Sequence, residues 1–330
     1  MPTPPLRFAV HAWAGTPAAT VELADGRLGA RAPDPAVRLR LPGTLSAGIH
    51  DRHVHLGLVD RARLSRSAVV AVDDLGWVPG EAAAWRRRPP ADVAVRIAGP
   101  FLAPPGGYPS GRSWAPDGAV REVRDERDVG AAIGELVETG AATAKVTLHA
   151  AFPDFAPGVL EALVAAARTA GLQVVAHVEG PGRAERALAA GVDALAHVPW
   201  TERLPDPLVV AFARRATWIS TLGLHTGFAR RRALGNARRF VAAGGRLVYG
   251  TDMGNGPTPA GVNRGEILEL GRAGLDGSAL LEALVGGPRD GMPLAAAVWS
   301  ERPMPEDARS VAAWFASARR FRPEHLEEMR

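Results

Sequence analysis

What the sequence lacks narrows its class before any motif is considered. The chain of 330 residues contains no cysteine, which excludes disulfides and thiolate catalysis. Its first ten residues, MPTPPLRFAV, lack the apolar core of a signal peptide, and no apolar run is long enough to span a membrane. No G-x-G-x-x-G follows an early strand, so a Rossmann cofactor site is not supported. With 47% hydrophobic residues, these absences predict a cytoplasmic globular protein.

Lysine is almost absent as well. Of the 39 lysines and arginines, 38 are arginine and one is Lys145, which lies among apolar neighbours in AATAKVTLHA. Arginine titrates late, so a pI of 10.4 at a net charge of +4 says little about nucleic acid. The runs 86–88 and 230–232 could form an anion patch, but interspersed acidic residues favour solvated helix faces. We therefore expect no nucleic-acid partner, and the single lysine calls for a chemical explanation.

The alternation of strand and helix patterns after about residue 47 predicts the fold. Short buried strands alternate there with helical patterns, several of which end in glycine. The predicted strands are 48–55, 68–75, 93–99, 142–148, 173–178, 193–198, 217–222 and 246–252. Eight strands with helices in most of the gaps indicate a (β/α)8 TIM barrel in the α/β class. A doubly wound open sheet is the alternative.

The two ends of the chain read differently from its middle. The first 45 or so residues form brief runs broken by Gly, Pro and Asp, which predict short strands and turns. After residue 300 the helical rhythm is lost, and VAAWFASARRF (311–321) fits either a strand or a terminal helix. We predict a small β-rich domain built from 1–46 and 300–330, attached to a barrel of 47–299.

The first barrel strand carries an alternating set of polar residues. Asp51, His53 and His55 are spaced by two, so all three are predicted to face the barrel interior, while His50 faces outward. In a barrel, side chains at the carboxyl ends of the strands converge on one site. Each of these residues alone would more often be an ordinary core or turn residue.

Other predicted strands place polar residues at the same end of the predicted barrel. Lys145 lies on the fourth strand, His177 and His197 near the ends of the fifth and sixth, and Asp252 at the end of the eighth. Four imidazoles, a carboxylate and a lysine would then share a small space. Such a group suits zinc and similar divalent ions. Four of only nine histidines meeting there by chance is improbable, so we predict a metal site.

These motifs resemble those of the amidohydrolase superfamily. AGIHDRHVHLG resembles its first-strand signature, and GAATAKV, VVAHVEG, GVDALAHV and VYGTDMG resemble its fourth-, fifth-, sixth- and eighth-strand motifs. GPFLAPPGGYPS resembles a third-strand loop of the imidazolonepropionase-like and prolidase-like branch. The resemblance covers roughly residues 40 to 275. It departs at Ala47 and His50, where Pro and an aliphatic residue are usual, and after the eighth strand, where the usual segments are not evident.

The resemblance implies a binuclear metal centre and a role for the lysine. Lys145 would react with carbon dioxide to form a carbamate that bridges two metals, which arginine cannot do. The implied metal ligands are His53, His55 and Asp252 for the more buried ion, and His177 and His197 for the more exposed one. Asp252 would carry the proton from a metal-bridging hydroxide to the leaving group. Asp51 would support these ligands without binding metal.

The resemblance also implies an activity. We expect hydrolysis of an amide-type C–N bond in a dipeptide, N-acyl amino acid or cyclic amide. The expected cofactors are two divalent ions, zinc first and manganese, iron or cobalt as alternatives, with CO2 as the carbamate on Lys145. The expected partner is a small-molecule substrate, with no membrane partner and with a homo-oligomer left open. Loop residues at the mouth that could touch substrate, or be ordinary loop residues, are Tyr108, His149, His225 and Asn255.

Three other functions remain as alternatives. A lactonase or phosphotriesterase-like enzyme could use the same binuclear centre. A deaminase fits less well, because deaminases of this superfamily generally use one metal and lack the fourth-strand lysine. A non-catalytic metal-binding barrel is the alternative from another class, and the complete ligand set argues against it.

Overall fold

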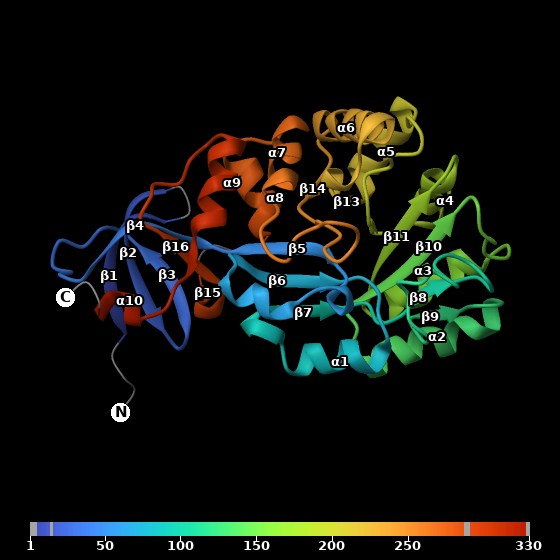
Figure 1. Cartoon of the computed structure of the whole chain (residues 1–330), viewed down its shortest axis with the longest axis horizontal. Coiled ribbons are helices and arrows are strands. Elements are labelled where there is room, and N and C mark those ends of the chain that lie inside the picture. The colour runs from blue at the N-terminus through green and yellow to red at the C-terminus, as the bar shows by residue number, and fades with distance from the viewer. Residues whose placement is uncertain (1–4, 14–15, 287–290, 328–330) are drawn as a thin grey trace.

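The computed structural model describes residues 5–13, 16–286 and 291–327, and it contains two kinds of β-structure. A mixed sheet lies at one end of the molecule, beside both termini, and parallel strands surrounded by helices form the rest (Figure 1). Strand β4 of the mixed sheet leads almost directly into β5, the first parallel strand. The class is therefore mixed α/β, as the sequence predicts.

The parallel strands lie where the sequence predicts them. Each of the eight predicted segments overlaps a strand of the structure, and β10 and β11 extend one residue beyond the prediction. The strands are β5 Ile49–Val54, β6 Val69–Asp74, β7 Ala94–Ile97, β10 Thr143–His149, β11 Gln173–Glu179, β12 Ala194–Leu195, β13 Thr217–Ile219 and β14 Leu247–Val248. They form two ladders, β5-β6-β7 and β14-β13-β12-β11-β10-β8-β9, in which every pairing is parallel.

Two short strands were not predicted, β8 Phe101–Ala103 and β9 Val120–Glu122. The third predicted strand ends at Ile97, and the chain turns at Gly99, whose φ of 74° lies in the left-handed region that favours glycine. After this turn β8 pairs with β10 and β9 instead of continuing the ladder of β6. The parallel strands therefore form two ladders rather than one continuous eight-stranded ring.

Backbone hydrogen bonds link the two ladders at both seams. The amide of Ala142, just before β10, donates to the carbonyl of Ile97 in β7 at 2.9 Å. At the other seam, His55 donates to the carbonyl of Met253 at 2.7 Å, and Val54 forms a parallel bridge with Met253. The ends of the two ladders are thus held beside one another.

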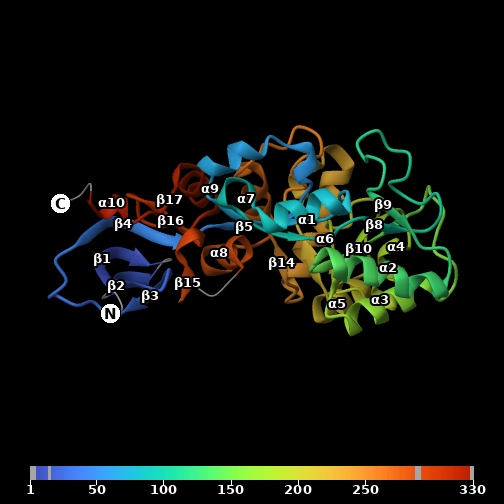
Figure 2. The same cartoon turned by 90° about the horizontal axis from the view of Figure 1, so that it is seen from below.

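Helices follow most of the parallel strands and lie outside them (Figure 2). In α2, Asp125 caps the first turn by accepting from the amides of Arg127 and Asp128, and Gly140 ends the helix with a φ of 74°. Its buried face repeats every three or four residues, as an amphipathic helix requires. The helices of this part are α1 Pro79–Arg87, α2 Glu126–Thr139, α3 Val159–Thr169, α4 Arg183–Ala190, α5 Asp206–Arg215, α6 Gly227–Ala242, α7 Arg264–Arg272 and α8 Gly277–Val285.

The mixed sheet takes strands from both ends of the described chain. Its order is β15-β3-β2-β1-β4-β16-β17, and β16 pairs antiparallel with β4. The 311–321 segment contains both predicted structures, because helix α9 ends at Ser317 and strand β17 follows at Arg319. The remaining elements are β1 Leu6–Trp13, β2 Thr16–Ala24, β3 Arg27–Arg31, β4 Arg40–Ala47, β15 Met292–Pro293, β16 Ala297–Ser300, α9 Ala308–Ser317, β17 Arg319–Arg320 and α10 Glu324–Glu327. In the described ranges, no helix combines the length and apolar character needed to cross a membrane.

Candidate functional site

A cavity of about 570 Å³ opens where the parallel strands end. Its wall includes all six residues that the sequence predicts to be metal ligands: His53, His55, Lys145, His177, His197 and Asp252. They come from β5, β10, β11 and the segments that follow β5, β12 and β14. Every one of them is buried, with at most 6% of its surface exposed. The fold therefore gathers side chains that are up to about two hundred residues apart in sequence.

Three of these side chains form a group that could hold a metal ion. Ligand atoms of His53, His55 and Asp252 all lie within 4.8 Å of one another. Oδ1 of Asp252 lies 3.4 Å from Nε2 of His53 and 3.2 Å from Nε2 of His55. Two imidazoles and a carboxylate are a donor set that divalent transition ions prefer.

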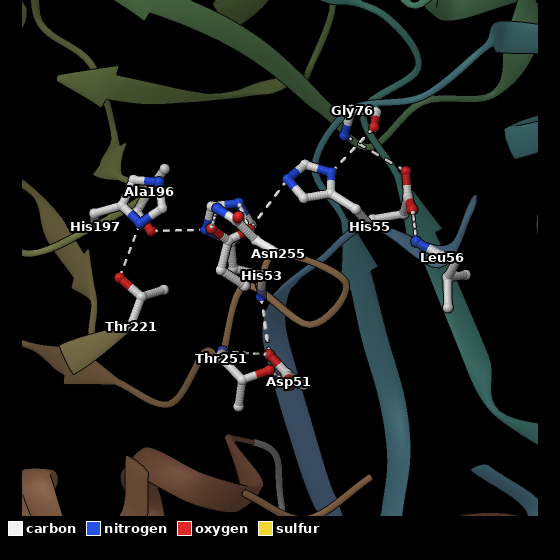
Figure 3. A network of polar contacts seen from close by, with 12 residues as sticks. Asp51, His53, His55, Leu56, Gly76, Ala196, His197, Thr221, Thr251 and Asn255 are labelled. Atoms are coloured by element: carbon white, nitrogen blue, oxygen red, sulfur yellow. Dashed lines mark hydrogen bonds and ion pairs between the residues drawn. The ribbon is translucent and has the colours of Figure 1, made fainter. Parts of the chain in front are cut away.

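The other ring nitrogen of three histidines is anchored (Figure 3). Nδ1 of His53 donates to the carbonyl of Ala196 at 2.8 Å, and Nδ1 of His55 donates to that of Gly76 at 3.1 Å. Nδ1 of His197 lies 2.9 Å from Oγ1 of Thr221. A hydrogen bond at Nδ1 fixes the orientation of the ring and leaves the lone pair of Nε2 free to bind a cation.

Several buried polar atoms of the cavity lack a hydrogen-bond partner within the described residues. They are Nε2 of His53, of His177 and of His225, and Oδ1 of Asp252. Burial lowers the pKa of His53 and His177, so both imidazoles are neutral near pH 7. Burial opposes the charged form of Asp252, but the neighbouring histidines lower the pKa of its carboxyl well below the usual range. Neutral imidazoles beside a carboxylate, with these atoms free of hydrogen bonds, form a site that a bound cation would satisfy.

Lys145 occupies the floor of this cavity. Only 1% of its surface is exposed. Burial lowers the pKa of its ammonium from 10.5 to about 7, against the opposing charges of Asp252 and Asp74. A large fraction of this lysine is therefore a neutral amine near pH 7, and a neutral amine can react with carbon dioxide.

Asp51 holds the segment that carries Asp252. Its Oδ1 accepts from the amides of His53 at 3.2 Å and Thr251 at 3.0 Å, and its Oδ2 accepts from the Thr251 hydroxyl at 2.6 Å. Asp51 is buried but does not line the cavity, unlike His53 and His55. The pairing of β5 with β6 shifts register between Asp51 and Val54, which breaks strict alternation.

The segment after β14 places Asp252 in an uncommon backbone conformation. Its φ of 53° lies in the left-handed region, which a non-glycine residue adopts at a cost. The contacts of Asp51 and the donation of Asn255 Nδ2 to Oδ2 of Asp252 at 2.8 Å hold it there. Strain of this kind is common at functional sites.

The four residues predicted at the mouth separate into two groups. Tyr108, His225 and Asn255 line the cavity. His149 is not part of the wall, but its ring lies 5.2 Å from that of Tyr108 and its Nε2 lies 3.2 Å from Oε2 of Glu179. His149 therefore contacts residues of the wall without lining the cavity itself.

The sequence reasoning missed three prominent wall residues: Trp114, Glu179 and Trp200. Glu179 follows His177 by two positions at the end of β11, so strand alternation could have placed it on the same face. Trp200 follows His197 just beyond β12, and only its nearness to a predicted ligand pointed to it. Trp114 lies in the long segment between β8 and β9, and no periodic signal marks it.

Comparisons with solved structures identify the same fold in several hydrolases. A candidate prolidase from Bifidobacterium longum is 20% identical, with a TM-score of 0.74 over 95% of this chain and 92% of the other. An ochratoxinase from A. niger is 15% identical, with a TM-score of 0.69 over 96% and 93% of the two chains. A bottromycin amidohydrolase is 23% identical, with a TM-score of 0.64 over 91% and 82%. These structural neighbours belong to the amidohydrolase superfamily, so the predicted resemblance is confirmed at the level of the fold.

Sequence comparisons add no closer relative. No protein-family model matches the chain, and a search of curated proteins finds no significant match. At identities of 23% or less, the structural likeness establishes the fold alone. The function must be argued from the cavity.

Proposed function

We propose that this chain, which shares the fold of amidohydrolase-superfamily enzymes, is a metal-dependent hydrolase of amide-type C–N bonds. The observation that carries the proposal is the set of buried ligand atoms of His53, His177 and Asp252 that make no hydrogen bond within the described residues and lie in one cavity. The neighbours with this fold include a Xaa-Pro dipeptidase and two proteins described as amidohydrolases, which supports hydrolysis at a C–N bond. Dipeptides, N-acyl amino acids and cyclic amides are the starting substrate classes.

The donor set fits two divalent ions, with zinc as the first candidate. His53, His55 and Asp252 would hold one ion and His177 and His197 the other. Lys145, once carbamylated, would supply an oxygen to each. Its burial among these residues supports that role, because an ammonium would repel both ions while a carbamate would attract them. When bound, the ions would supply a water of lowered pKa and polarise the substrate carbonyl.

The protein's own residues would then handle the proton and the geometry. Asp252 would accept the proton of the attacking water and deliver it to the leaving nitrogen, while Asn255 orients the carboxylate through its hydrogen bond to Oδ2. Thr221 and the carbonyls of Ala196 and Gly76 would hold the imidazole rings in the orientation that directs Nε2 toward the metal. Oxygen from water ends on the acyl carbon, the C–N bond breaks, and the amine leaves with the transferred proton.

We infer that the two parallel ladders close into a (β/α)8 barrel within 47–299. Strands β15 and β16, at the end of that range, join 1–46 and 300–330 in the small β-rich domain. The hydrogen bonds from Ala142 to Ile97 and from His55 to Met253 support closure at both seams. A closed barrel would explain why residues from β5, β10 and β11 reach one cavity.

The decisive test measures metal content and turnover on the same preparation. Elemental analysis of protein purified without chelator, or reconstituted with zinc and bicarbonate, is expected to give near two equivalents per chain. A panel of amides, lactones and phosphotriesters is expected to show amide hydrolysis that disappears with chelator. Hydrolysis of lactones or phosphotriesters alone would favour the lactonase-like alternative. A fully metallated protein without turnover would favour a non-catalytic barrel, and failure to load any metal would end the proposal.

A further inference from the structure

Several aromatic rings line the cavity beside the predicted metal centre. The rings of Tyr108 and His177 stack at 4.7 Å, Tyr108 lies 6.2 Å from Trp114, and Trp200 stacks on His225 at 4.8 Å. All of these residues line the cavity. Such a wall provides apolar area for an aromatic substrate group, and its ring faces attract cations.

Apart from Lys145 of the predicted metal centre, no lysine or arginine is among the described residues that line the cavity. None of the 38 arginines of the chain contributes to the described lining of the cavity. Arg112 lies close by, with its guanidinium carbon 5.8 Å from the ring centre of Tyr108 and 5.1 Å from that of Phe152, but its side chain is exposed to solvent. A substrate carboxylate would therefore find no guanidinium partner on the wall, although arginine is the usual bidentate partner of carboxylates.

The wall does provide a negative charge. Glu179 lines the cavity, and 31% of its side-chain surface is exposed. Its Oε2 lies 3.4 Å from Nε2 of His177 and 3.2 Å from Nε2 of His149. Since His177 is a predicted metal ligand, a group that binds Glu179 must lie close to the bond being hydrolysed. A carboxylate placed there suits an ammonium on the carbon next to the substrate carbonyl.

We propose that the substrate is an aminoacyl amide of an aromatic amine, with its α-ammonium bound by Glu179. Its aromatic group would pack against Tyr108, Trp114 and Trp200, and no free carboxylate would be required. Hydrolysis would release an amino acid and an arylamine. This inference rests on the proposed amide hydrolysis and narrows it, because dipeptides and N-acyl amino acids both carry a carboxylate that the wall does not match.

A matched pair of substrates tests the inference on the metal-loaded full-length protein. Alanine para-nitroanilide and propionic acid para-nitroanilide differ only in the ammonium group. We expect the wild-type protein to prefer the alanyl compound, and Glu179→Gln to reduce that preference about tenfold in kcat/KM. Comparing the variant with the wild type cancels the difference in intrinsic reactivity between the two amides. Glu185→Gln, which alters an exposed glutamate of α4 away from the cavity, is expected to keep the wild-type preference.

A binding measurement keeps this inference separate from the proposed activity. Tryptophan fluorescence, reported by Trp114 and Trp200, would follow titration with phenethylammonium and with its neutral counterpart, phenethyl alcohol. We expect about tenfold tighter binding of the ammonium, lost in a folded Glu179→Gln protein. An ammonium preference without any amide hydrolysis would keep the recognition site and overturn the proposed function. Amide hydrolysis with equal preference in both proteins, or faster turnover of alanyl para-aminobenzoate than of the nitroanilide, would overturn the inference alone.

Discussion

His50 and His53 lie three residues apart on the same strand, yet their surroundings are opposite in kind. At the amino end of the parallel strands, Nε2 of His50 bonds Oδ1 of Asp73 at 2.7 Å, and Arg96 approaches the same carboxylate at 3.8 Å. At the carboxyl end, Nε2 of His53 makes no hydrogen bond to any described residue. Charged groups at the amino end therefore neutralise one another, while those at the carboxyl end require something from outside.

The cavities at the two ends show the same contrast. The one at the amino end has a volume of about 70 Å³ and mixes Arg52 and Arg246 with Asp73 and Asp193. The one at the carboxyl end has a volume of about 570 Å³ and holds the predicted metal ligands. Burial of polar residues is thus common to both ends, and the presence or absence of an internal partner distinguishes a structural cluster from a candidate site.

Among the variants considered, Asp252→Asn is expected to cause the largest loss of activity at the carboxyl-end cavity. The amide keeps the size of the side chain but cannot accept the proton, and it binds a cation poorly. We expect kcat to fall about a thousandfold or more. The metal-free variant should unfold at a lower temperature than the wild type at pH 7, because the neighbouring histidines lower the pKa of Asp252 and its ionised form therefore stabilises the fold. Asp117→Asn, at an exposed position, is the matched control. Full activity in the Asp252 variant would contradict the mechanism.

Lys145→Arg tests why one position of the chain differs from the other 38 basic residues. Arginine keeps the positive charge but cannot form a carbamate. Removing a group that binds the metal itself should reduce activity more than removing a residue that only hydrogen-bonds to a metal ligand. We therefore expect at least about a hundredfold loss of activity. Bound metal should fall from two equivalents to one or fewer, measured by elemental analysis. The reciprocal change at an exposed site, Arg127→Lys, should alter neither quantity. Two equivalents of metal in the Lys145 variant would rule out the bridging role.

Glu266 is a buried carboxylate near the carboxyl ends of the strands that does have hydrogen-bond partners within the protein, so it can be compared with the predicted metal ligands. Glu266 of α7 accepts from the amides of Leu222 at 2.9 Å and Gly223 at 2.6 Å, next to the Thr221 that contacts His197. Burial raises its pKa from 4.5 to about 7. As pH rises, the unfolded state releases this proton first, so the contribution to stability is full below pH 4.5 and is lost by about pH 7.

Between pH 4.5 and about 7, we therefore expect the free energy of unfolding of the wild-type protein to fall by about 3 kcal/mol because of Glu266. The Glu266→Gln variant should not show this fall. Urea unfolding of both metal-free proteins at several pH values measures the difference. Asp51, whose pKa burial also raises to about 7, contributes with the same sign in both proteins and cancels. Identical pH profiles would show that the pKa of Glu266 is not raised in the folded protein.

Much of the fold and most of the candidate ligands could be predicted from the sequence, for identifiable reasons. Buried parallel strands leave continuous apolar runs, and polar residues at their carboxyl ends interrupt those runs conspicuously, as at His177 and Asp252. The split of the third strand depends on a change of pairing partner after Gly99, which local pattern does not encode. The aromatic wall could not be predicted either, because Trp114 reaches the cavity from a segment without periodicity.

The smallest expected effect is on stability, and it comes from substitutions that compare the two histidines of β5, His50 and His53. His50→Leu removes the partner of a buried carboxylate and should lower the free energy of unfolding by about 1–3 kcal/mol while leaving kcat unchanged. His50→Gln, which can place an amide nitrogen near Oδ1 of Asp73, should recover part of that loss. His53→Leu should lower activity and bound metal as well, and its loss of stability in the metal-free protein should reflect the hydrogen bond that Nδ1 donates to Ala196. Chemical unfolding and kinetics on the three variants measure this, and equal loss of activity at both positions would mean that the amino-end cluster also serves the reaction.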